Sequence, residues 1–312
     1  MPVRLLFSAA EQLYPVWHGP LARQLEECGI DAEISDRTDH PETIDYIACS
    51  PNGPISDFKP FSRLKAVLSL WAGVEQLLDN PTIHRPIARM VDSGMTESMT
   101  AWVVGQTLRH HLGLDRVIAN QDGTWHRELL PALPRATTVA VLGLGQLGRA
   151  SAAMLSSLNF RVIGWSQRSK DLRGIECRTG RDGLESAVAE ADIIVLLLPH
   201  TKATTNLVDA TLLTKFKPGA MIINSGRGAL IDEDALLDAL TSGRIAHATL
   251  DVFQTEPLPR EHPFWMHPHV TVSPHIAADT PVETAAAVIV ENIRRGEHGM
   301  DFLYLADKDR GY

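Results

Sequence analysis

The chain has 312 residues, enough for two domains of ordinary size, and its 44% hydrophobic and 21% charged residues exclude a mainly disordered chain. A net charge of −9 disfavours a general binder of nucleic acid, because such a surface repels phosphate groups. No apolar run is long enough for a membrane span, and three scattered cysteines without a CxxC pair indicate reduced thiols in a cytoplasmic protein.

The first third of the sequence alternates short apolar runs with a helical pattern. The apolar run at 3–8 has no charged segment before it and no cleavage-like spacer after it, so it predicts a first strand and not a signal peptide. An amphipathic helix is expected at 21–28, where Gly29 would end it. Further strands are expected at 44–49, 66–70 and 87–91. This alternation is typical of a parallel sheet covered by helices.

A second series of the same kind follows a long helix. Residues 96–111 contain no proline and one glycine, which predicts a single helix, and a polar stretch with prolines follows at 120–135. Further strands are expected at 138–142, 161–165, 192–198, 221–224, 248–252 and 270–273, and helices at 146–158, 234–240 and 281–295. The expected fold class is therefore α/β, with two Rossmann-like or flavodoxin-like domains that carry parallel sheets and have a cleft between them.

A glycine-rich loop between a predicted strand and a predicted helix indicates a dinucleotide site. Its pattern is G-x-G-x-x-G: the first glycine permits a tight turn, the second lets a pyrophosphate approach the backbone, and the third lets the helix pack closely on the strand. The helix N-terminus would face the phosphate charge. A merely structural turn would not need three glycines at this spacing. The cofactor-binding residues expected here are Gly143, Gly145, Gln146, Leu147 and Gly148.

Three further segments carry side chains suited to catalysis. Arg227 lies in Asn-Ser-Gly-Arg-Gly, Glu256 in Asp-Val-Phe-Gln-Thr-Glu-Pro, and His275 in Ser-Pro-His-Ile-Ala-Ala. Each segment follows a predicted strand, and in an open parallel sheet the residues just beyond the strands line the ligand crevice. We therefore expect the three side chains to converge beside the nicotinamide end of a bound dinucleotide.

Taken together, these motifs resemble the D-isomer-specific 2-hydroxyacid dehydrogenase family over nearly the whole chain. The glycine loop, the strand 193–199 and the three catalytic segments occur in the order and spacing of that family. Within it, the segments 71–75 (Trp-Ala-Gly-Val-Glu), 92–97 (Asp-Ser-Gly-Met-Thr-Glu) and 310–312 (Arg-Gly-Tyr) resemble the glyoxylate/hydroxypyruvate reductase A branch.

The resemblance implies a role for each matched residue. His275 would give a proton to the carbonyl oxygen of a 2-oxo acid, which suits a side chain that exchanges protons near neutral pH, and Glu256 would pair with its far ring nitrogen. Arg227 would hold the carboxylate and carbonyl oxygens of the substrate in a planar fork. The other residues implied are Ala72, Gly73 and Val74 for the substrate and Pro199, Thr204, Ser225, Gly226 and Asp251 for the cofactor.

The residues after the second strand of the dinucleotide domain favour NADPH over NADH. An NAD site usually has an acidic residue there, whereas this chain continues as Ser-Gln-Arg-Ser-Lys. Ser166 can hydrogen-bond a 2′-phosphate, and Arg168 and Lys170 offer positive charge. The reductase A branch usually has an arginine directly after the serine, where this chain has Gln167, so which cation reaches the phosphate stays open. We expect NADPH as the preferred cofactor and NADH as a second one.

The sequence thus predicts an NADPH-dependent oxidoreductase that reduces glyoxylate to glycolate and hydroxypyruvate to D-glycerate, and the family implies a homodimer. Two alternatives stay open. Residues 50–53 (Ser-Pro-Asn-Gly) leave room for a bulkier 2-oxo acid, and a dinucleotide-sensing regulator could keep the same fold. No metal is expected, because the histidines of the segment 262–269 have no further ligand at a recognised metal spacing.

The domain boundaries follow from the two α/β series. Residues 1–95 plus 285–312 are expected to form the substrate domain, and 96–284 the dinucleotide-binding Rossmann domain. The segments 96–111 and 281–295 would connect them as a hinge.

Overall fold

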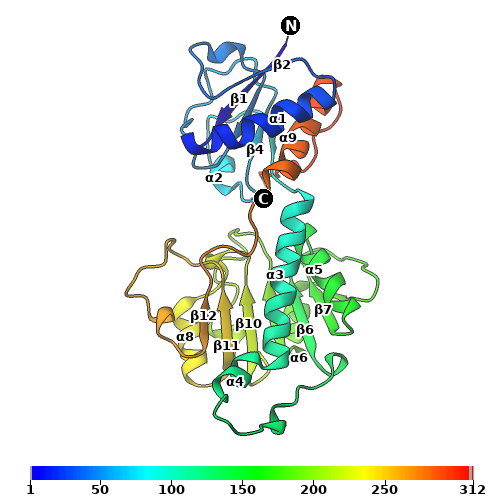
Figure 1. Cartoon of the computed structure of the whole chain (residues 1–312), viewed down its shortest axis with the longest axis vertical. Coiled ribbons are helices and arrows are strands. Elements are labelled where there is room, and N and C mark those ends of the chain that lie inside the picture. The colour runs from blue at the N-terminus through cyan, green and yellow to red at the C-terminus, as the bar shows by residue number, and fades with distance from the viewer. Residues whose placement is uncertain (1, 309–310, 312) are drawn as a thin grey trace. The chain divides into compact units, whose positions relative to one another are not determined.

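The computed structural model describes residues 2–308 and 311, and it divides into two compact units, Met1–Met95 with Asp279–Tyr312, and Thr96–Ala278. Each unit has its own parallel sheet with helices around it (Figure 1). Of the motif at 310–312, Arg310 and Tyr312 lie outside the described residues. Among the residues that are described, no helix has the length and apolar character needed to cross a membrane.

The first unit is a five-stranded parallel sheet with strand order β2-β1-β3-β4-β5, which is the flavodoxin-like order. Strands β3 and β4 are buried along their whole length, which explains their continuous apolar sequences. The strands are β1 (Val3–Ser8), β2 (Ala32–Ser35), β3 (Tyr46–Cys49), β4 (Ala66–Ser69) and β5 (Ile87–Ala88). The helices are α1 (Tyr14–Glu27), α2 (Glu75–Leu78) and α9 (Val282–Glu297).

The end of the chain completes this first unit. Helix α9 packs against α1 (Figure 1), and the hydroxyl of Tyr46 on β3 donates a hydrogen bond of 2.7 Å to Glu297 of α9. Beyond the helix, the N–H of Ala306 donates to the carbonyl of Ile87 at 2.8 Å, so the tail runs along β5. The first unit is therefore built from both ends of the sequence.

The second unit is a seven-stranded parallel sheet with strand order β12-β11-β10-β9-β6-β7-β8. The order reverses between β6 and β9, which is the switch point of a Rossmann fold, so the α/β prediction with two parallel sheets is confirmed. Its strands are β6 (Thr138–Leu142), β7 (Arg161–Trp165), β8 (Glu176–Arg178), β9 (Ile193–Leu196), β10 (Ala220–Asn224), β11 (Ile245–Leu250) and β12 (Val270–Val272). Its helices are α3 (Ser93–Leu112, which begins in the first unit), α4 (Leu114–Ala119), α5 (Gln146–Ser157), α6 (Gly180–Glu190), α7 (Ala210–Leu213) and α8 (Glu233–Thr241).

Two apolar cores cover the two faces of this sheet. Helices α6, α7 and α8 contribute buried residues to one core, and α3 and α5 contribute to the other. Two edge strands, β2 and β8, were not predicted, because they are short and half exposed and so lack an apolar run. Helix α6 was also missed, since it opens with Gly-Arg-Asp-Gly, in which two glycines and an aspartate disfavour a helix. The helix predicted at 21–28 begins earlier, at Tyr14, because Pro15 fits the first turn of a helix.

Candidate active site

The glycine loop after β6 has the geometry of a phosphate cradle. Gly143 has φ +111°, a conformation that favours glycine, and a Cβ there would lie 2.5 Å from the carbonyl oxygen of Leu197. A Cβ on Gly148 would lie 1.7 Å from the carbonyl oxygen of Gly143, so α5 packs directly on the loop. A Cβ on Gly145 would meet nothing within 4 Å. No side chain among the described residues caps α5, so its first N–H groups remain for a ligand.

Two more glycines hold the loops after β9, β10 and β11 against one another. A Cβ on Gly226 would lie 2.9 Å from the carbonyl oxygen of Leu198, in the loop after β9. A Cβ on Gly228 would lie 1.9 Å from the carbonyl carbon of Phe253, in the loop after β11. Arg227 stands between these glycines, so its backbone is fixed beside the loop that carries Glu256.

His275 and Glu256 form the pair that the resemblance implied. Nδ1 of His275 lies 2.7 Å from Oε2 of Glu256, and the other carboxylate oxygen accepts the N–H of Phe253 at 2.9 Å. The His275 side chain is 54% exposed, so the ring is open to a ligand. Because an ionised carboxylate only accepts hydrogen bonds, Nδ1 carries a proton and Nε2 remains for exchange with a substrate.

The backbone of His275 is in the left-handed region, with φ +56°, a conformation that costs about 1 kcal/mol for a residue with a side chain. Asp251, 1% exposed, holds this loop in place. Its carboxylate accepts hydrogen bonds from the hydroxyl of Ser273 at 2.5 Å and from the N–H groups of Ile276 at 3.0 Å and Ala277 at 2.9 Å. The sequence placed Asp251 beside the nicotinamide; in the structure its carboxylate is engaged by the His275 loop, and a cofactor contact stays a prediction.

Arg227 is half buried, and its loop is organised by Asn224. The side chain of Asn224 accepts the N–H of Gly226 at 3.1 Å and donates to the carbonyl of Arg227 at 3.0 Å. The guanidinium of Arg227 donates to the carbonyl of Gly226 at 2.8 Å. Next to it, the buried hydroxyl of Ser225 has no hydrogen-bond partner among the described residues. A buried polar atom without a partner costs free energy, which fits a position beside a ligand.

Thr204 and Pro199 shape the loop after β9. The Thr204 hydroxyl is buried; it donates to the carbonyl of Pro199 at 2.7 Å and accepts the N–H of Thr201 at 2.8 Å. Both residues were predicted to contact the cofactor. The contacts that the structure shows are within the loop itself, so their contact with a cofactor stays a prediction.

The segment after β7 is exposed and carries the cations that were predicted to select a 2′-phosphate. Ser166 donates through its hydroxyl to the carbonyl of Arg168 at 2.6 Å and so closes a turn. Arg168 and Lys170 are exposed and form no ion pair within residues 2–308 and 311. Both cations are thus available to an anion, and the structure does not favour one of them.

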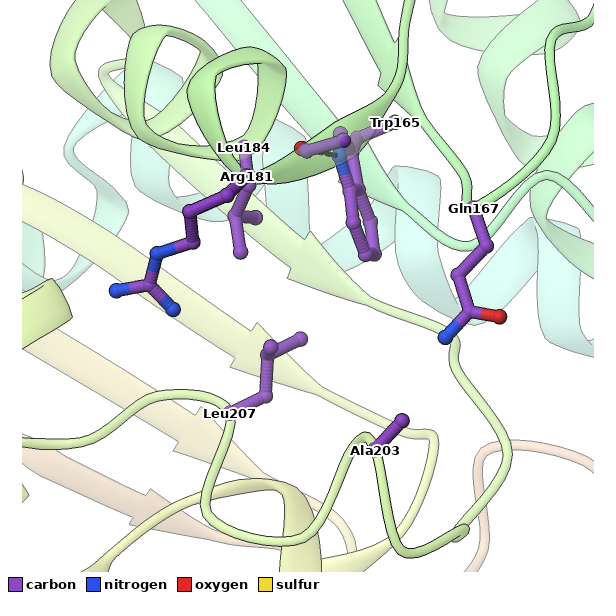
Figure 2. Close-up of a pocket in the computed structure, with 7 residues that line it drawn as sticks. Trp165, Gln167, Arg181, Leu184, Ala203 and Leu207 are labelled. Carbon is purple, nitrogen blue, oxygen red and sulfur yellow. Dashed lines mark hydrogen bonds between the residues drawn. The ribbon is translucent and has the colours of Figure 1, made fainter.

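A hollow of about 270 Å³ adjoins this segment (Figure 2). Arg181 and Gln167 reach into it from opposite sides, with Ala203 and Leu207 between them in the view. The guanidinium of Arg181 is also paired with Glu185 at 2.8 Å. Arg181 was missed by sequence reasoning because α6, whose first turn carries it, was not predicted.

In the first unit, the predicted substrate donors lie between β4 and α2. The turn is fixed by Ser69, whose hydroxyl donates to the carbonyl of Trp71 at 2.9 Å. The backbone N–H groups of Ala72, Gly73 and Val74 are absent from the hydrogen bonds that the described residues form. Three neighbouring N–H groups without a partner among the described residues are suited to an anion.

The histidines of the segment 262–269 have few partners in the structure. His262 faces Glu233, with 3.4 Å between Nε2 and Oε2, and the rings of His267 and His269 lie 5.9 Å apart. Within the part of the chain that the structure describes, no three His, Cys, Asp or Glu side chains are arranged to hold a metal ion.

Comparison with known proteins identifies the class to which this site belongs. Residues 102–277 match the model of the D-isomer specific 2-hydroxyacid dehydrogenase, NAD binding domain. Glyoxylate/hydroxypyruvate reductase A of Yersinia enterocolitica is 38% identical over 257 residues, which cover 80% of this chain and 82% of the relative. The reductase A of Serratia proteamaculans is 36% identical over 258 residues, with the same coverage of 80% and 82%.

Solved structures are similar over the full length. A D-isomer specific 2-hydroxyacid dehydrogenase from Xanthobacter autotrophicus Py2, in complex with NADPH and MES, has a TM-score of 0.92 and 37% identity and covers 100% of both chains. An NADPH-dependent glyoxylate/hydroxypyruvate reductase from Sinorhizobium meliloti, in complex with NADP and sulfate, has a TM-score of 0.86 and 30% identity over 99% of this chain and 100% of that one.

The chain belongs to the D-isomer-specific 2-hydroxyacid dehydrogenase family, in its glyoxylate/hydroxypyruvate reductase A branch. It is an NAD(P)-dependent oxidoreductase, and the resemblance found in the sequence is confirmed.

Proposed function

We propose that this protein reduces small 2-oxo acids, glyoxylate and hydroxypyruvate first, with NADPH as the hydride donor. The observation that carries the proposal is the paired His275 and Glu256, fixed in the second unit beside the loop of Arg227. A dinucleotide-sensing regulator would not need an exposed histidine paired with a carboxylate.

The second unit has the features that a dinucleotide requires. The open space at Gly145 and the uncapped N-terminus of α5 suit a pyrophosphate. The hydroxyl of Ser225, which has no partner among the described residues, suits a ligand atom at the carboxyl end of β10. Arg168 and Lys170 would bind a 2′-phosphate, with Arg181 as a further cation close by. When bound, NADPH supplies a hydride. The structures from Xanthobacter autotrophicus and Sinorhizobium meliloti, which contain NADPH or NADP, support this cofactor.

The residues of this chain then have distinct tasks. Arg227 holds the carboxylate and carbonyl oxygens of the 2-oxo acid through its guanidinium fork. Nε2 of His275 gives its proton to the carbonyl oxygen as the carbonyl carbon is reduced, and Glu256 stabilises the protonated ring before that transfer. The free N–H groups of Ala72, Gly73 and Val74 are proposed as further donors to the substrate carboxylate.

Steady-state kinetics on a panel of 2-oxo acids tests the function. We expect the highest kcat/KM with glyoxylate or hydroxypyruvate, and a bulkier 2-oxo acid as the best substrate would favour the alternative dehydrogenase. In His275→Asn, kcat should fall roughly 10²- to 10⁴-fold while the cofactor still binds, because only the proton donor is lost. A wild-type chain that binds NADPH but reduces none of the acids would support the regulator instead.

The cofactor preference has its own test. We expect a higher kcat/KM with NADPH than with NADH, and a smaller ratio in Arg168→Ala. Equal use of both cofactors by the wild type would contradict the preference. If the ratio of kcat/KM with NADPH to kcat/KM with NADH is unchanged in Arg168→Ala, then Lys170 or Arg181 binds the 2′-phosphate. The alanine variants of these two residues are therefore compared in the same assay.

We also propose a homodimer in the cytoplasm. Large apolar side chains on and after α4 are exposed in the single chain: Ile118 is 65%, Trp125 87% and Leu130 82% exposed. An exposed apolar surface of this kind favours association with a second copy. Light scattering should give the mass of a dimer, and Ile118→Asp combined with Leu130→Asp should give a monomer.

A further inference from the structure

The loop that carries Glu256 is held at two points by a single side chain. Glu233 is the first residue of α8, directly after its N-cap, Asp232. One carboxylate oxygen, Oε1, accepts the N–H of Gln254 at 3.0 Å. The other, Oε2, lies 3.4 Å from Nε2 of His262. The carboxylate therefore bridges the two ends of the segment 254–262, and Glu256 lies within that segment.

The tautomer of His262 is fixed by its other nitrogen. Nδ1 accepts the N–H of Phe264 at 3.3 Å, so the proton of the neutral ring is on Nε2, which faces Glu233. The His262 and Glu233 side chains are each 19% exposed, so water screens this contact less than it would on an open surface.

Gln254, which Glu233 contacts, directly follows the residue that hydrogen-bonds the proposed catalytic pair. Phe253, the residue before Gln254, donates its N–H to Glu256 at 2.9 Å, and Glu256 in turn pairs with His275. The side-chain amide of Gln254 also donates a hydrogen bond of 2.8 Å to the carbonyl of Ile231, so Gln254 is held through both its backbone and its side chain. Displacement of Gln254 would therefore move a donor on which the position of the Glu256 carboxylate depends.

We propose that Glu233 is a positioning residue, which fixes the segment 254–262 so that Glu256 stays paired with His275. The inference rests on the proposed role of that pair in 2-oxo acid reduction. Glu233 acts through Gln254 and His262 and touches neither His275 nor Glu256 in the contacts of the described residues.

Four variants separate positioning from a general effect on folding. Glu233→Ala removes both contacts, whereas Glu233→Gln keeps an oxygen that can accept the N–H of Gln254. Asp234→Ala is the matched control, because Asp234 carries the same charge on the same turn of α8 but is exposed and has no partner among the described residues. His275→Asn identifies the ring signal of His275 by its loss.

The first measurement is the titration of the His275 ring by NMR on ¹⁵N-histidine protein. In Glu233→Ala its midpoint should move to lower pH by about 0.5 unit or more, because the protonated ring loses part of the stabilisation that a well-placed carboxylate provides. Glu233→Gln and Asp234→Ala should titrate as the wild type does. An unmoved midpoint in folded Glu233→Ala would overturn the proposal, and this readout does not depend on what the chain reduces.

The second measurement is kcat/KM for reduction. We expect a loss of roughly 10-fold or more in Glu233→Ala, with an unchanged Kd for NADPH and recovery in Glu233→Gln, because small displacements of catalytic groups are costly. Equal losses in Glu233→Ala and Asp234→Ala would count against positioning. If the midpoint moves but neither the wild type nor any variant reduces a 2-oxo acid, the positioning role holds and the proposed function fails.

Discussion

At the scale of single residues, the site combines one exposed titratable ring with side chains that are tightly held. His275 is exposed, whereas Asp251, which holds its loop, is almost fully buried. Arg227 is fixed in a different way, by glycines on both sides that let neighbouring backbones approach to contact distance. A guanidinium on a rigid backbone binds a carboxylate in one geometry, which is what a hydride transfer to the adjacent carbon requires.

The shape of the Arg227 side chain is therefore as important as its charge. In Arg227→Lys we expect kcat/KM for glyoxylate to fall about 100-fold or more, because an ammonium group cannot form the bidentate contact, while the Kd for NADPH stays unchanged. Steady-state kinetics and a fluorescence titration of the cofactor measure the two quantities. Arg260→Lys, on the exposed loop after β11, is the control and should behave as the wild type. Retention of most activity in Arg227→Lys would rule out a bidentate substrate contact.

At the scale of elements, apolar periodicity predicted the buried strands and the long helices, but it missed the two edge strands β2 and β8. Strands β1, β6 and β7 begin and end where their apolar runs do. The strand β8 was missed because it is short and half exposed and has no apolar run, and the helix α6 because its first turn carries two glycines and an aspartate. Arg181, on α6, was therefore not predicted as a candidate site residue.

The proposed catalytic positions could be predicted for a different reason. They lie directly after buried strands, in segments whose glycines, Asp-Val-Phe and Pro-His patterns match a known family. The residues that hold these positions in place could not be predicted. The hydrogen bonds of Glu233 and Asp251 depend on side-chain directions that only the folded loops define. A sequence pattern thus indicates the candidate catalytic residues, and the structure adds which side chains hold their loops in place.

The packing of α5 on the loop after β6 predicts different effects for substitutions at two glycines, Gly148 and Gly145. A methyl group on Gly148 would overlap the carbonyl of Gly143, so Gly148→Ala should lower the melting temperature and weaken cofactor binding together. A methyl group on Gly145 meets no protein atom, so Gly145→Ala should keep the melting temperature and still raise the Kd for NADPH about tenfold or more. Thermal unfolding and cofactor titration measure both effects. An unchanged Kd in Gly145→Ala would show that the pyrophosphate does not approach this glycine.

At the scale of the whole molecule, the stability of the second unit depends on histidines that fold in their neutral form. Burial lowers the pKa of His110 on α3 to about 3, and burial likewise lowers the pKa of His247 on β11 to about 4. Their rings lie 5.2 Å apart, and His110 hydrogen-bonds Thr249 at 3.0 Å. Two neutral histidines therefore stand between the long helix and the sheet.

These histidines should make the protein sensitive to acid. An unfolded histidine titrates near pH 6.5, so between about pH 6.5 and 4 the unfolded chain binds more protons than the folded one, and the free energy of unfolding falls as the pH falls. His110 alone should contribute a slope of up to about 1.4 kcal/mol per pH unit. Denaturant unfolding at several pH values should show a flatter dependence in His110→Gln than in the wild type. The exposed His84→Gln is the control, and an equal slope in His110→Gln would contradict the assignment.

The chain enters the second unit after Met95 and leaves it at Ala278, so one compact unit is inserted into the sequence of the other. During synthesis, residues 96–278 are complete before the ribosome has made α9 and the tail that cover β3 and β5. The second unit can therefore fold before the last helix of the first unit has been synthesised. A chain truncated before α9 would keep Arg227, Glu256 and His275 and all five strands of the first sheet, but it would lack the helix and the tail that cover β3 and β5.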